Sequence, residues 1–116
     1  SGGRSNNGKG ARSNLHEYLR LLNQKVKNNW LPPRGVDRIA IIEFRISKEG
    51  KLVSTKAMPH GATENSDRAA EAAAIAALSK TFPFFPLPAE IKTTYLDVRY
   101  TFNYRFNQID EVSSAQ

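Results

Sequence analysis

The chain has 116 residues, of which 40% are hydrophobic, and this is enough for one domain with a modest core. It contains no cysteine, which excludes disulfides and thiolate metal sites and leaves the cellular compartment open. No apolar run approaches the roughly eighteen residues of a membrane-spanning helix.

The net charge of +6 is unevenly distributed along the chain. Residues 1–58 carry twelve Lys and Arg against four Asp and Glu, whereas residues 59–116 carry five against seven. A basic half suits nucleic acid, anionic lipid or acidic peptides. The positive residues are scattered rather than clustered, which favours an ordinary solvated surface.

The N-terminal stretch 1–12 is rich in Gly, Ser and Asn, and it is expected to be a flexible lead that follows a cloning remnant. The first helix is predicted to start at Asn14, where Glu17 completes a capping box. Its apolar stripe is formed by Leu15, Leu19, Leu22 and Val26. Trp30, followed by Leu-Pro-Pro33, ends the helix, because proline disfavours a helical conformation in the preceding residue. Trp30 is expected to be a core residue rather than a ligand-stacking one.

A β-hairpin is predicted next. The strand 36–47 is rich in β-branched residues, Gly50 suits the left-handed position of the turn, and 52–58 returns antiparallel. A second helix follows, capped by Asn65 or Ser66 and rich in alanine. The stretch 82–88, Phe-Pro-Phe-Phe-Pro-Leu-Pro, is expected to be a rigid connector over the core rather than a ligand for aromatic grooves.

The last predicted strand, Tyr95–Phe106, alternates strictly between two faces. The apolar face is formed by Leu96, Val98, Tyr100, Phe102, Tyr104 and Phe106. The polar residues 107–116 are expected to form a flexible tail, so that the domain spans residues 13–106. The predicted fold is α+β, in the order α-β-β-α-β, with a three-stranded antiparallel sheet and two helices on one face.

Enzymatic groups are scarce, and the chain is predicted not to be an enzyme and to need no cofactor or metal. The only histidines are His16 and His60. His60 near Glu64 is more simply a solvated loop residue than half of an acid–base pair. A nucleic-acid module is not favoured either, because the open face of the last strand offers one aromatic residue, Tyr95, beside Arg99 and Arg105.

The remaining hypothesis is recognition by a sheet edge. If the last strand is an outer one, its unpaired N–H and C=O groups can capture a guest strand. The expected partner-binding residues are Leu96, Asp97, Val98, Arg99, Tyr100, Thr101, Phe102 and Asn103. Arg99 and Asn103 would orient the guest. The alternative use of this edge is pairing with a second copy in a homodimer.

Five segments, in this order and spacing, resemble the TonB/TolA-type C-terminal domain family over residues 15–106. They are Tyr18–Arg34, Phe44–Leu52, Asp67–Ala70, Phe85–Pro88 and Leu96–Tyr104. The resemblance implies a periplasmic domain that an N-terminal segment, absent from this fragment, anchors to the inner membrane.

Such a domain would couple the proton-motive force, harvested by an ExbB/ExbD-type motor, to transport across the outer membrane. It would bind a short periplasmic segment of the transporter, the TonB box, by strand addition to its last strand. The alternative is a TolA-like domain that links Tol-system or other envelope partners.

Overall fold

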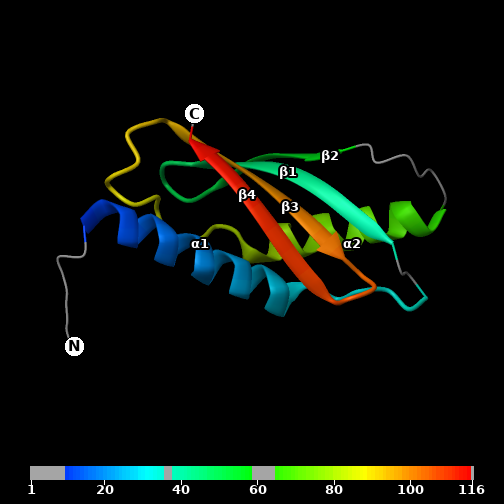
Figure 1. The fold of residues 1–116 in the computed structure, drawn as a ribbon. Helices are drawn as coiled ribbons and strands as arrows, with labels where there is room; N and C mark the ends of the chain where they lie inside the picture. The colour runs from blue at the N-terminus through cyan, green and yellow to red at the C-terminus, as the bar shows by residue number, and fades with distance from the viewer. Residues whose placement is uncertain (1–9, 36–37, 59–64, 116) are drawn as a thin grey trace.

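The computed structural model describes residues 10–35, 38–58 and 65–115 (Figure 1). The elements along the chain are α1 (Gly10–Asn29), β1 (Ile39–Ser47), β2 (Leu52–Ala57), α2 (Asn65–Thr81), β3 (Tyr95–Asn103) and β4 (Gln108–Ala115). α1 begins before the predicted Asn14, which therefore lies inside the helix and not at its cap. Residues 1–9, most of the expected flexible lead, fall outside the described residues.

The four strands form one antiparallel sheet in the order β2-β1-β3-β4. Both helices cover the same face of this sheet (Figure 1). The predicted α+β class and the two helices on one face are therefore confirmed. The prediction of three strands is wrong, because β4 forms within the stretch that was expected to be a tail.

The predicted twelve-residue strand is interrupted by a turn at residues 104–107. Asn103 accepts a hydrogen bond through its Oδ1 from the N–H of Phe106 at 3.1 Å, and Asn107 adopts a positive φ of 54°. Asparagine tolerates the left-handed region and bonds to nearby backbone, so this pair replaces the glycine that a hairpin would otherwise need. Phe106, expected on the buried face, is 66% exposed at the turn.

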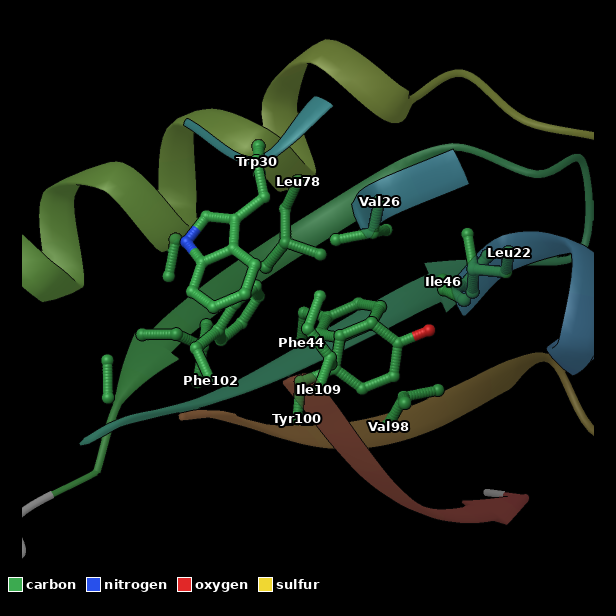
Figure 2. Close-up of a cluster of buried hydrophobic side chains, with 14 of the residues drawn as sticks. Leu22, Val26, Trp30, Phe44, Ile46, Leu78, Val98, Tyr100, Phe102 and Ile109 are labelled. Atoms are coloured by element: carbon green, nitrogen blue, oxygen red, sulfur yellow. The ribbon is translucent and has the colours of Figure 1, made fainter. Parts of the chain in front are cut away.

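The core lies between the helices and the inward face of the sheet (Figure 2). Leu22 and Val26 of α1 are fully buried, as the predicted stripe requires. Trp30 is buried at the end of α1 and packs edge-on against Phe102 and Tyr104, with ring centroids 5.3 and 4.8 Å away. The prediction that Trp30 is a core residue is confirmed.

The alanines of α2 let that helix approach its neighbours closely. Ala70, Ala74 and Ala77 are buried, and the hydroxyl of Tyr104 donates a hydrogen bond to the carbonyl oxygen of Ala70. Small side chains at the contact permit this close approach, and their strong helix propensity keeps the helix regular.

The proline-rich connector packs on the core, as predicted, and it also fastens the β1–β2 turn. The N–H of Phe84 donates to the carbonyl of Gly50 at 2.8 Å, and the N–H of Leu87 donates to that of Lys48 at 3.0 Å. The Tyr18 hydroxyl of α1 donates to the carbonyl of Phe85 at 2.8 Å. The connector therefore joins the first helix to the hairpin.

We predict that Gly50→Ala destabilises the domain by about 2–3 kcal/mol more than Gly35→Ala. Both glycines have positive φ, 90° and 77°, so each variant incurs backbone strain of about 1 kcal/mol. A Cβ at Gly50 also collides with the carbonyl oxygens of Phe84 and Phe85, whereas one at Gly35 meets no atom within 4 Å. Urea unfolding of the two variants measures the difference, and equal losses would contradict the close packing of the connector.

Candidate functional site at the β4 margin of the sheet

β3 lies in the middle of the sheet, so the expectation that it has a free edge is wrong. Its backbone pairs with β1 from Ile39–Asn103 to Ser47–Tyr95. On its other side it pairs with β4 from Leu96–Ala115 to Asn103–Gln108. The error follows from the missed turn after Asn103, because a chain that ended there would leave β3 outermost.

The eight predicted partner-binding residues thus occupy a central strand. The inward members Leu96, Val98, Tyr100 and Phe102 are buried in the core. The other four, Asp97, Arg99, Thr101 and Asn103, lie on the sheet face that the helices leave open. Asn103, expected to orient a guest, uses its side-chain oxygen in the β3–β4 turn instead.

Ion pairs cross the open face between β1 and β3. Arg45 donates two hydrogen bonds to the carboxylate of Asp97, at 2.7 and 3.0 Å, and its guanidinium lies over the ring of Tyr95. The hydrogen bonds from Arg45 hold the pKa of Asp97 below its usual value. Arg99 donates to Glu43 at 3.1 Å. These arginines are therefore partnered within the sheet, and Arg99 could orient a guest only by sharing its charge with Glu43.

The sheet has two outer margins, and they differ in their regularity. At β2 the register with β1 shifts between Arg45 and Ile46, and Lys56 is exposed on the strand. A bulge and a lysine both discourage the addition of another strand. β4 pairs with β3 through eight consecutive positions without a shift, so its outer edge presents a regular row of backbone groups. The β4 margin is therefore the candidate site.

β4 is held by few side-chain contacts. Its inward positions include Ile109, Glu111 and Ser113, opposite Phe102, Tyr100 and Val98. Ile109 is 9% exposed, and it is the one large apolar side chain that β4 contributes to the described core (Figure 2). Val112, on the other face, is 70% exposed.

A single side chain of α1 hydrogen-bonds to β4 in the described part of the chain. The Nδ2 of Asn23 donates to the carbonyl of Ile109 at 3.4 Å and to the Oε1 of Glu111 at 3.1 Å. Beside this contact lies a hollow of about 450 Å³ lined by His16, Leu19, Arg20, Asn23, Gln24 and Glu111. β4 thus bonds fully to β3 by its backbone but only lightly to the layer of helices.

The other candidate residues form no catalytic arrangement within the described segments. His16 is exposed on α1, and His60 and Glu64 fall outside the described residues. In residues 10–35, 38–58 and 65–115, no three of the His, Asp and Glu side chains gather into a metal site. As far as those residues go, neither helix combines the length and hydropathy needed to cross a bilayer.

Sequence reasoning missed β4 and the residues that hold it, Asn23, Ile109 and Glu111. β4 has two large apolar residues, Ile109 and Val112, and they are out of phase with strand alternation. The usable signal was the pair of asparagines Asn103 and Asn107, which marks a turn within the apparent twelve-residue strand.

We predict that Ile109→Ala selectively loosens β4. Loss of this buried side chain costs about 2 kcal/mol, which raises the open fraction of the strand about 30-fold. Amide hydrogen exchange on β4, compared with that on β1, measures the opening. Val112→Ala is the matched control. Val112 lies on the same strand but is exposed, so this variant should leave exchange unchanged. Equal effects of the two variants would contradict the assignment of Ile109 as the contact that holds β4.

The chain was also compared with known proteins. Neither the comparison with curated proteins nor the one with solved structures gave a significant match. One family model, described as TonB C terminal, matches residues 15–102, which run from the first turns of α1 almost to the end of β3. This match covers most of the chain and includes both helices and three of the four strands, so the chain belongs to the TonB C-terminal domain family.

Proposed function

We propose that this is the periplasmic binding domain of a TonB-like energy transducer, which captures a short segment of outer-membrane transporters as a strand that pairs with β3 in place of β4. The observation that carries the proposal is the lightly held strand β4 at a regular margin of the sheet. The family supports a role with outer-membrane transporters in general and a periplasmic location. The role is binding and not catalysis.

The guest strand takes the place of β4 beside β3. The backbone of Leu96–Asn103 then binds the guest. These are the residues expected from the sequence, but β4 must leave before they become accessible. Tyr100 and Phe102 form an apolar surface beside the place that β4 now occupies. β4 covers that surface with Glu111 and Ile109, so only one of its two side chains there is apolar. The family match ends at residue 102, before β4 begins.

Exchange of strands explains how such binding stays reversible. A guest replaces the backbone hydrogen bonds of β4 one for one, so the net gain comes from side chains. An apolar residue in place of Glu111 contributes about 1–2 kcal/mol. β4 competes from the end of a short turn, at an effective concentration of about millimolar or higher. A gain of that size is a factor of about 5–30, so a guest should bind with a Kd of roughly tens of micromolar or weaker.

The remainder of the transduction scheme lies outside the described residues. An N-terminal segment would anchor the domain to the inner membrane, where an ExbB/ExbD-type motor would supply energy from the proton-motive force. The captured transporter segment would receive that energy through the β3 backbone.

We predict that fastening β4 to β3 abolishes capture. The double variant Thr101→Cys/Asp110→Cys places a cysteine pair at neighbouring register positions on the open face, in a chain with no other cysteine. A synthetic peptide that carries a transporter's TonB box is titrated into the intact domain, and binding is followed by fluorescence anisotropy. Oxidised protein should bind at least tenfold more weakly than the same protein after reduction.

The control for this experiment is Glu43→Cys/Lys56→Cys, which fastens the opposite margin through another register pair. It should bind equally before and after reduction. If the oxidised β3–β4 variant still captures the peptide, the guest adds to the outer edge of β4 instead. If reduced and wild-type domains both fail to bind, the transporter role is wrong, and Tol-system partners are the next probes. Pairing of the β4 margin between two copies of the chain is tested separately, by light scattering as the protein is diluted.

A further inference from the structure

Glu111 is a carboxylate at a position whose neighbours are buried. It faces Tyr100 across the β3–β4 pairing, on the side of the sheet that the helices cover. Tyr100 is fully buried, and its hydroxyl has no hydrogen-bond partner in the described part of the chain. Among the described residues, one hydrogen bond to the Glu111 carboxylate is found, and Asn23 donates it. A charged group here keeps only part of its contact with water.

The surroundings of Glu111 act on its charge in opposite directions. Burial raises the pKa of Glu111, whereas the hydrogen bond from Asn23 and the nearby His16 lower it, and the net pKa is above its ordinary value of 4.5. The titratable and charged groups that face it are His16 and Arg20 from α1 and Tyr100 from β3. Asp110, its neighbour on β4, points to the opposite face.

We propose that Glu111 makes the attachment of β4 depend on pH, so that β4 holds the margin of the sheet more firmly in acid than at neutral pH. A detached β4 returns the carboxylate to water, whereas docking removes part of that water. Protonation removes this penalty. It also places a donor on the face where the Tyr100 hydroxyl lacks a partner.

The sign of this pH dependence follows from the linkage between proton binding and the docking of β4. A carboxyl group whose pKa is raised on docking stabilises the docked state below its free pKa, and that contribution is lost as the pH rises through the docked value. The change therefore begins near 4.5 and extends above it. Acid therefore strengthens the docking of β4 through Glu111.

The proposal has a consequence for capture, and this part rests on the proposed function. A guest that needs the place of β4 competes with a more firmly held strand in acid. Capture is then favoured at neutral pH and resisted when the surroundings acidify.

The test measures protection factors of β4 amides in the intact domain from pH 4 to 7.5, each corrected for the intrinsic exchange rate. In the wild type, protection should fall as the pH rises, by up to about tenfold for each unit by which docking raises the pKa of Glu111. Glu111→Gln keeps an acceptor for Asn23 but cannot ionise. It should show high protection and lose most of the pH dependence.

The matched control is Asp110→Asn, which removes a charge from the exposed face of the same strand. It should keep the wild-type profile. A flat wild-type profile, an unchanged profile in Glu111→Gln, or loss of the dependence in Asp110→Asn would each overturn the proposal. No peptide is needed, so a pH-dependent β4 in a domain that captures no transporter peptide would refute the proposed function alone. Peptide capture with a flat β4 profile would refute this inference alone.

Discussion

The pairing of β1 with β3 is the interaction on which the rest of the structure depends. Its nine consecutive antiparallel positions join the hairpin in the first half of the chain to the strand after the connector. The pairing places Phe44 and Tyr100 in edge-to-face contact, with ring centroids 5.0 Å apart, and the helices then pack on this aromatic layer. β2 and β4 flank this pair, one on each side. The β1–β3 pair is therefore the centre of the fold, and the outer strands can differ in how firmly they are held.

Much of this centre was predictable from sequence because its residues obey strong local rules. The alternation of β3, the apolar stripe of α1 and the alanines of α2 each specify which face is buried. The number of strands was not predictable in the same way. Tyr104 and Phe106 continue the alternation of β3 although they lie in a turn, and only Tyr104 is buried. Periodicity shows which face of a strand is buried, but it does not show where the strand ends.

The candidate site was harder to predict for a related reason. β4 obtains its structure mainly from backbone bonds to β3, and those bonds leave little trace in its amino acids. Its polar residues are also those expected of a solvated tail. The binding residues assigned to β3 lie on a strand whose backbone is regular, but the residues that fasten the strand beside it, Ile109 and Glu111, belong to β4.

The basic composition of the chain also has a different meaning in the folded protein. Arg45 and Arg99 are paired with Asp97 and Glu43 on the open face of the sheet. Positive charge from the first half of the chain, on Arg45, is thus neutralised by a carboxylate from the second. Across β1 and β3 the open face is consequently not a positive surface, which is consistent with recognition through backbone groups rather than through charge.

The β2 and β4 margins of the sheet are fastened unequally, and this difference allows the binding selectivity of the domain to change. The connector fastens the β1–β2 turn with backbone hydrogen bonds, while β4, apart from its pairing with β3, contacts the helical layer mainly through Ile109 and Asn23 of α1. Under the proposed exchange, the stability of docked β4 sets the affinity that a guest strand must exceed. Substitutions in β4 at positions other than Ile109, which is buried in the core, would raise or lower that threshold without disturbing the core. Selectivity among guest strands could then change through substitutions in β4, while the β3 surface that binds them stays the same.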